Sequence, residues 1–212
     1  MMRLGVMANG AISDYVWLKS ICVQLDGLIC ADGGANHAYV AGFTPKMIVG
    51  DLDSVKPEVL KYYMELGVPV HRFAVEKDET DLQLALGEAI ELGAKQIVLL
   101  GAVGNRIDHV LGNISLLVFL HTHGVKGVIL DEHNELSLAE AEVTINGTPG
   151  EEVSLLPLTA AVTGIWTENL KYPMQGGEFK LGNPRGISNV LMAESARVTM
   201  EQGLLLVIKS RD

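Results

Sequence analysis

The stretch Pro45-Lys-Met-Ile-Val-Gly-Asp-Leu-Asp53 organises both the predicted fold and the predicted chemistry of this chain. Its apolar run predicts a buried strand that ends in a glycine and two aspartates. In extended backbone alternate side chains point the same way, so Asp51 and Asp53 are expected to share a face. Two such carboxylates repel each other unless a cation lies between them, and Mg²⁺ is the usual ion. The alternative is a plain turn that caps a helix beginning near Pro57.

Short apolar runs alternate with amphipathic segments through residues 1–131, which is typical of βαβ units and a mostly parallel sheet. The apolar runs predict strands at 3–8, 27–31, 47–49, 70–74, 96–100 and 127–130. The amphipathic segments predict helices at 12–23, 36–41, 57–66, 81–92 and 109–123. The sequence therefore predicts an α/β domain over residues 1–131.

Residues 132–212 have a different pattern, because helical periodicity gives way to short alternating runs separated by Gly, Pro and Asn. These runs predict a second, all-β domain. Its expected strands are 142–146, 152–156, 161–165, 196–201 and 204–208. The last two are joined through Gln202-Gly203 and are expected to form a hairpin.

Composition narrows the class of protein. The chain has 212 residues, of which 48% are hydrophobic, and its longest apolar runs are far shorter than the roughly 20 residues that span a bilayer. The beginning of the chain does not resemble a secretory signal, so we expect a cytoplasmic protein without a membrane partner. A net charge of −10 argues against a nucleic-acid surface and favours a cationic co-substrate. Cys22 and Cys30 are expected to be core residues.

Polar residues and glycines follow five successive predicted strands, at the edge where parallel sheets bind ligands. These exits are 9–10, 32–34, 50–53, 77–81 and 101–108. Glycines at positions 33, 34, 101 and 104 would let backbone amides approach phosphate, although an ordinary tight turn is the favoured interpretation of each one taken alone. Lys77 and Arg106 are suited to phosphate contact, the alternative being solvated surface charges. The sequence has neither a Walker A motif nor a Gly-x-Gly-x-x-Gly motif.

Carboxylates are more numerous at these exits than one Mg²⁺ requires. They belong to Asp32, Asp51, Asp53, Asp78, Asp81 and Asp108. Some must have other roles, such as orienting a hydroxyl nucleophile or balancing the charge of a cationic substrate.

Six short blocks resemble, in order, the motifs of one enzyme family. They are 31–36 (Ala-Asp-Gly-Gly-Ala-Asn), 50–54 (Gly-Asp-Leu-Asp-Ser), 77–81 (Lys-Asp-Glu-Thr-Asp), 106–109 (Arg-Ile-Asp-His), 170–173 (Leu-Lys-Tyr-Pro) and 186–189 (Gly-Ile-Ser-Asn). The family is thiamine pyrophosphokinase, whose members transfer pyrophosphate from ATP to thiamine and release AMP. The resemblance covers nearly the whole chain.

The resemblance implies an α/β catalytic domain followed by a β-sandwich, and a homodimer whose sites are shared between subunits. By this resemblance, Mg²⁺ is held by Asp51, Asp53 and Asp81, and the geometry of the nucleophile and phosphates is supported by Asp78 and Asp108. The phosphates are contacted by Lys77, Thr80 and Arg106, and the rest of the nucleotide site is formed by Asp32, Gly33, Gly34 and Asn36. Thiamine is contacted by Ser188 and Asn189. A metal-dependent phosphohydrolase, or a nucleotide-sensing protein without turnover, remains an alternative built from the same residues.

Two segments depart from the family pattern. Asn105 stands where the second glycine of Gly-Gly-Arg is often found. Val190 and Leu191 stand where an acidic residue and an aromatic often follow Ser-Asn, so another aromatic is expected to stack on the thiazolium ring. Trp166 and Tyr172 are the candidates, and the alternative is apolar packing by Leu191 and its neighbours.

Overall fold

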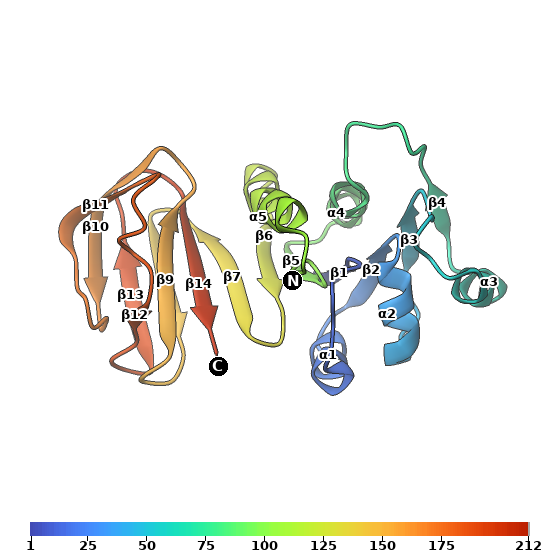
Figure 1. Cartoon of the computed structure of the whole chain (residues 1–212), viewed down its shortest axis with the longest axis horizontal. Coiled ribbons are helices and arrows are strands. Elements are labelled where there is room, and N and C mark those ends of the chain that lie inside the picture. Colours follow the sequence, from blue (N-terminus) through green and yellow to red (C-terminus); the bar gives the residue numbers. More distant parts are fainter. Residues whose placement is uncertain (212) are drawn as a thin grey trace. The chain divides into compact units, whose positions relative to one another are not determined.

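A computed structural model describes residues 1–211. The chain folds into two compact units. The first unit is Met1–Glu132, and the second begins at His133. Figure 1 shows the first unit in blue to yellow-green and the second in yellow to red. Among the described residues no helix is both long and apolar enough to cross a membrane.

The first unit is built on a parallel sheet. Its strands lie in the order β6 (Lys126–Leu130), β5 (Gln96–Leu100), β1 (Arg3–Met7), β2 (Gly27–Ala31), β3 (Met47–Gly50) and β4 (Val70–Arg72). Neighbouring strands pair in parallel, with Ala31 of β2 opposite Val49 of β3. The predicted α/β class is confirmed, and the carboxyl ends of the strands share one edge.

Helices connect these strands. They are α1 (Tyr15–Cys22), α2 (Gly34–Ala41), α3 (Pro57–Glu65), α4 (Asp81–Glu91) and α5 (Ile107–Thr122). α1 begins three residues later than predicted because the Asp14 carboxylate caps it, accepting from the amides of Val16 at 2.8 Å and Trp17 at 2.9 Å. α2 and α5 each begin two residues earlier than predicted.

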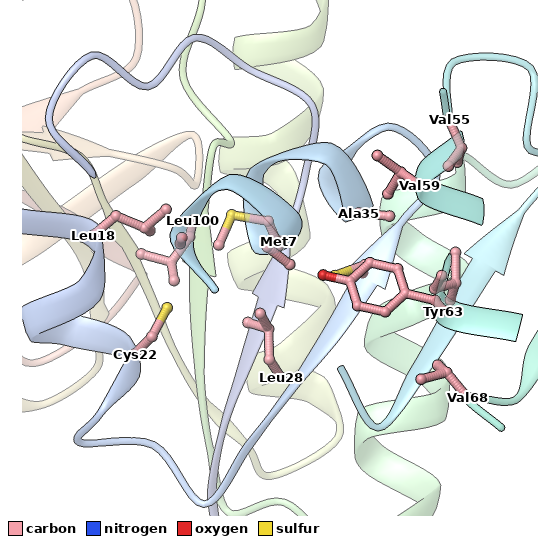
Figure 2. Packing of buried hydrophobic residues seen from close by; sticks show 14 of the residues in the cluster. Met7, Leu18, Cys22, Leu28, Ala35, Val55, Val59, Tyr63, Val68 and Leu100 are labelled. Atoms are coloured by element: carbon pink, nitrogen blue, oxygen red, sulfur yellow. The ribbon is translucent and has the colours of Figure 1, made fainter. Parts of the chain in front are cut away.

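A hydrophobic cluster packs α1, α2 and α3 against the sheet (Figure 2). Met7 and Leu28 come from the central strands, and Leu18 of α1 and Tyr63 of α3 cover them. Each buried aliphatic side chain of this kind stabilises the fold by about 1.5–3 kcal/mol. The Tyr63 hydroxyl donates to the Phe43 carbonyl at 2.7 Å, so its burial leaves no polar group unpaired.

The two cysteines are core residues, as predicted. Cys22 and Cys30 are buried free thiols. Burial raises the pKa of the Cys22 thiol to about 11, and it raises the pKa of Cys30 further. Both are therefore protonated at neutral pH and unreactive.

The second unit contains two antiparallel groups of strands. One has the order β12 (Asn189–Val190), β9 (Glu152–Pro157), β14 (Leu205–Ser210) and β7 (Asn134–Ala139). The other has the order β11 (Gln175–Lys180), β10 (Ala161–Glu168), β13 (Ser195–Thr199) and β8 (Glu142–Asn146). Alternate side chains of both groups, such as Val153, Leu155, Ile165 and Val198, form a common core. The sequence analysis missed β7, β11 and β12.

The predicted hairpin across Gln202-Gly203 is wrong. β13 pairs with β8 and β10, whereas β14 pairs with β7 and β9. Residues 200–204 therefore carry the chain from one layer of the sandwich to the other. The alternating pattern correctly indicated which side chains are buried, but alternation carries no information about which strand lies alongside.

Candidate active site

Three carboxylates come together at the carboxyl edge of β2 and β3. Among the described residues, the carboxylate oxygens close enough to share one ion belong to Asp32, Asp51 and Asp53, all within 4.8 Å of one another. Asp32 follows β2 directly, and the aspartate pair follows β3. Asp32 is buried, Asp51 is half-buried and Asp53 is exposed, so the group opens from the protein to solvent. An oxygen-only ligand set with an open side fits a hard divalent cation such as Mg²⁺.

The prediction that Asp51 and Asp53 share a face because they lie in extended backbone is wrong, although the two carboxylates do converge. Strand β3 ends at Gly50, and Leu52 has a φ of +70°, so the segment is a turn and not extended backbone. The Asp53 amide donates to Asp51 Oδ1 at 3.1 Å across this turn. Ser54 Oγ then donates to Asp53 Oδ1 at 2.7 Å, which orients the second carboxylate.

Burial gives Asp32 an unusual protonation equilibrium. Loss of hydration raises the pKa of the Asp32 carboxyl most, hydrogen bonds from Gly33 and Ser54 lower it by less, and the negative charge of Asp53 raises it by the smallest amount. The Ser54 amide donates to Asp32 Oδ1 at 3.2 Å. A cation bound beside this group would favour its charged form and lower the pKa again.

Asp81, a predicted metal ligand, lies beside the carboxylate group but is engaged elsewhere. It begins α4, and its Oδ1 accepts from Lys77 Nζ at 2.7 Å, with both side chains largely buried. Gly50, with a φ of +142°, allows this approach, because a Cβ there would lie 3.0 Å from Asp81 Cγ and 3.1 Å from Asp32 Cβ. Lys77 thus already neutralises one carboxylate at this edge.

The other residues predicted around α4 have simpler surroundings. Thr80 caps α4, its Oγ1 accepting from the Gln83 amide at 3.2 Å. Asp78 is exposed in the loop before the helix. Thr80 therefore has a structural role, and its hydroxyl lies at the positive end of a helix.

Arg106 and Asp108 form a bidentate pair ahead of α5. Arg106 donates to Asp108 Oδ2 at 2.6 Å and, through Nε, to Oδ1 at 3.3 Å. Their side chains are 71% and 64% exposed. The side-chain hydrogen bond from Arg106 lowers the pKa of Asp108 to about 2, so this carboxylate is ionised and a poor base while the pair persists.

The Asp-Gly-Gly block connects β2 to the start of α2. Gly33 is the residue before the helix, and a Cβ on Gly34 would collide with the Met7 carbonyl. Gly34 is therefore required for close packing of helix on strand, which is the structural alternative left open by the sequence. Asn36 bridges to the aspartate turn, donating to the Ser54 carbonyl at 2.9 Å and accepting from the Lys56 amide at 3.0 Å.

Sequence reasoning missed the residues that fix the loop after β1. Glu132 Oε1 accepts from the Ser13 amide at 2.7 Å and the Asp14 amide at 2.9 Å. The Tyr15 hydroxyl lies 2.8 Å from His37 Nδ1. Only the folded chain brings these partners together, and the lone Glu or His in the sequence gave no signal of its role.

In the second unit, Asn189 is buried and acts as a clamp on the backbone of Tyr172. Its Oδ1 accepts from the Tyr172 amide and its Nδ2 donates to the Tyr172 carbonyl, both at 2.9 Å. Ser188, with a φ of +55°, is exposed beside it. Tyr172 itself is 59% exposed, and Lys171 Nζ lies 5.5 Å from its ring centroid. The clamp thus presents Tyr172 outward, whereas Leu191 is buried.

Comparison with known families decides which chemistry this arrangement serves. The catalytic-domain model of thiamin pyrophosphokinase matches residues 18–129, and the vitamin B1 binding-domain model of the same enzyme matches residues 140–205. The chain belongs to the thiamine pyrophosphokinase family. The resemblance noted in the sequence is confirmed.

Relatives agree over most of the chain's length. Thiamine pyrophosphokinase of Bacillus subtilis is 30% identical over 186 residues, covering 87% of each chain, and thiamine pyrophosphokinase 1 of Oryza sativa is 27% identical over 87% of this chain and 79% of its own. The crystal structure of the Bacillus subtilis enzyme superposes with a TM-score of 0.88, 26% identity and 99% of each chain covered. The crystal structure of the Geobacillus thermodenitrificans enzyme superposes with a TM-score of 0.83 and 28% sequence identity, covering 100% of this chain and 98% of the other.

Membership of the family assigns the activity. The protein is an enzyme that makes thiamine pyrophosphate by transferring pyrophosphate from ATP to thiamine. The phosphohydrolase and sensor alternatives are set aside by these matches, because both halves of the chain match models of the pyrophosphokinase.

Proposed function

We propose that this pyrophosphokinase works with Mg²⁺ held by Asp51, Asp53 and Asp81, with Asp32 beside them. The observation that carries the proposal is the convergence of the Asp32, Asp51 and Asp53 oxygens within 4.8 Å. Three carboxylates at that separation repel one another, and a divalent ion offsets the repulsion. When bound, Mg²⁺ supplies positive charge to the phosphate oxygens of ATP.

Lys77 competes with a metal ion for the Asp81 carboxylate. In the structure Lys77 Nζ and Asp81 Oδ1 are 2.7 Å apart. We propose that Lys77 transfers its hydrogen bonds to a phosphate oxygen when ATP binds, which frees Asp81. The exchange keeps every charge paired, because the ammonium gains a phosphate as the carboxylate gains Mg²⁺.

Arg106 and Asp108 are proposed to undergo a similar exchange. Arg106 turns its planar group from Asp108 to a phosphate, for which its fork is equally suited. Asp108 then loses the partner that lowers its pKa, and with Asp78 it orients the thiamine hydroxyl and receives its proton. Thr80, Gly33, Gly34 and Asn36 complete the nucleotide site in this proposal, with the start of α2 facing a phosphate.

The reaction then balances as a single displacement. The thiamine hydroxyl oxygen forms a bond to the β-phosphorus, the bond from that phosphorus to the oxygen bridging it to the α-phosphorus breaks, and AMP leaves. The protein contributes mainly by positioning the alcohol in line with the leaving group.

Thiamine is proposed to bind through the second unit. Tyr172 and Ser188 are exposed, and the Asn189 clamp fixes the backbone between them. A tyrosine ring that already attracts the Lys171 ammonium suits the cationic thiazolium. Asn189 acts in this proposal by holding Tyr172, which refines its predicted direct contact.

We further propose a homodimer with sites shared between subunits, acting in the cytoplasm. The support is chemical, since the candidate metal carboxylates belong to the first unit and the candidate vitamin residues to the second. Mixing an Asp53→Asn protein with a Ser188→Ala/Tyr172→Ala protein restores activity if each mixed dimer contains one intact site. A monomeric mass at working concentration contradicts the proposal.

Product analysis tests the reaction itself. With Mg²⁺, ATP and thiamine, the enzyme is expected to form AMP and thiamine pyrophosphate in equal amounts. Formation of ADP indicates transfer of the γ-phosphoryl group alone. Phosphate or pyrophosphate released without thiamine supports a phosphohydrolase.

A further inference from the structure

Leu52, between the two paired aspartates, has a backbone conformation that leucine rarely adopts. Its φ is +70°, in the left-handed region where a Cβ crowds the backbone. Asp32 at the adjacent strand exit also has a positive φ, +43°, but aspartate tolerates this conformation far better. Leu52 is therefore the residue at this edge whose conformation requires a cause.

The cause is the position of its side chain. Leu52 is 9% exposed and belongs to the hydrophobic cluster that includes Val55, Val59 and Tyr63. The side chain is thus held in the core, while the carboxylates on either side of it lie at the sheet edge. A buried apolar group keeps the backbone in a conformation that it would otherwise leave.

The left-handed turn has a geometric consequence for the carboxylates. Here the carboxylate oxygens of Asp51, Asp53 and Asp32 lie within 4.8 Å, and the Asp53 amide reaches Asp51 Oδ1 at 3.1 Å. The left-handed turn at Leu52 therefore lies between two converging carboxylates that are joined across it by this hydrogen bond.

We propose that Leu52 is a positioning residue for the metal site, its buried side chain holding the turn that brings Asp51 and Asp53 together with Asp32. The inference rests on the proposed function, in which these carboxylates bind Mg²⁺. Leu52 touches neither metal nor substrate in this scheme. It acts through the backbone that it fixes.

Binding of Mn²⁺ alone, followed by electron paramagnetic resonance without nucleotide, tests the inference. In Leu52→Ala the anchor is lost while the Cβ still disfavours the turn, so Mn²⁺ affinity is expected to fall by about tenfold or more, as for other residues that orient metal ligands. Leu52→Met keeps the anchor and should bind as wild type. Leu52→Gly permits the turn freely and is expected to bind Mn²⁺ better than Leu52→Ala.

That order separates positioning from simple core packing. If Leu52 only fills the core, the glycine variant should be no better than the alanine variant at binding Mn²⁺, and that result would overturn the inference. Val68→Ala is the matched control, because Val68 is 8% exposed in the same cluster. It should lower the unfolding temperature and leave Mn²⁺ affinity unchanged.

The outcomes also separate this inference from the proposed function. If Leu52→Ala binds Mn²⁺ with wild-type affinity, the positioning role of Leu52 is overturned. The proposed function is unaffected by that result as long as the wild-type enzyme turns over. Failure of the folded wild-type enzyme to bind Mn²⁺ overturns both the metal site and the inference. Failure to form thiamine pyrophosphate with Mn²⁺ bound overturns the proposed catalytic role of the ion site and leaves the positioning role of Leu52 standing.

Discussion

The carboxylate edge of β2 and β3 and the loop between β5 and α5 both place charged residues after a parallel strand, but they are built differently. Asp32 and Asp51 are buried or half-buried and fixed by backbone amides and a strained turn. Arg106 and Asp108 are more than half exposed and bind mainly each other. The first region is fixed within the fold, whereas the second is held mainly by one exposed ion pair. In the proposed scheme, the first region would hold a metal ion and the second would adapt to a nucleotide.

Asp53→Asn tests the preorganised edge and should have the largest effect. Loss of one charged ligand is expected to reduce kcat by about 10²-fold or more with the fold retained, by analogy with other electrostatic catalytic groups. Steady-state assays over a range of Mg²⁺ concentrations measure it. Asp26→Asn is the control, because Asp26 lies away from the site. Its Oδ2 accepts a hydrogen bond of 2.7 Å from the Arg3 amide. Near-normal turnover at saturating Mg²⁺ removes Asp53 from the metal site.

Gly50→Ala tests whether the edge tolerates any extra atom. The backbone at φ +142° is unfavourable for alanine, and the Cβ would press on Asp81 and Asp32. We expect a loss of about 1–3 kcal/mol in unfolding free energy from the backbone alone, with a raised Mg²⁺ requirement. Gly42→Ala provides the control, since Gly42 has a φ of +77° but nothing within 4 Å of its Cβ position. Equal effects of the two variants on Mg²⁺ dependence would show that crowding is unimportant.

The sequence predicted much of this fold because its signals were local. Leucine spacing predicted α4, and the polar strand exits predicted which edge carries the carboxylates. The resemblance to the family was confirmed. What it missed depends on distant partners: β14 pairs away from β13, Glu132 binds residues 13 and 14, and Asn189 clamps Tyr172. The Asp51–Asp53 pair was predicted for the wrong reason, because the local sequence does not indicate that Leu52 adopts a left-handed backbone conformation.

Arg106→Ala tests the exchangeable region. Removing the proposed phosphate contact should raise the KM for ATP by about tenfold or more, with little change in unfolding temperature because the residue is exposed. Arg197→Ala is a close match, as Arg197 donates to both oxygens of Glu142 at 2.8 and 3.1 Å with similar exposure. An unchanged KM for ATP in Arg106→Ala contradicts the phosphate role.

Tyr172→Ala extends the comparison to the second unit, where an exposed ring is fixed by a buried clamp. Loss of a cation–π contact of about 0.5–2 kcal/mol predicts a KM for thiamine raised roughly 2- to 30-fold, with the KM for ATP unchanged. Trp166→Ala, which removes an aromatic that is 53% exposed on β10, distinguishes the two candidates. Normal thiamine binding by both variants and by the double variant would exclude aromatic stacking.

The smallest expected effect is a change in the titration of Asp108. Because Arg106 lowers its pKa to about 2, the pair contributes stability above the unfolded value, and that contribution disappears as the pH falls from about 4 towards 2. In Arg106→Ala the pKa should return towards its ordinary value. Nuclear magnetic resonance titration of the carboxyl carbons measures it, and Glu142, whose pKa is lowered by Arg197, should titrate as before.

The position of β14 has a consequence for the order in which the protein matures. This strand comes late in the chain, yet it lies between β7 and β9 and bonds to both along Leu205–Ser210. During synthesis the first unit has all of its strands and helices available long before β14 emerges from the ribosome. In the second unit, by contrast, the edges of β7 and β9 that pair with β14 stay unpaired until β14 has been synthesised. The vitamin-binding half is therefore the last part to become native and the part exposed for longest to aggregation or proteolysis.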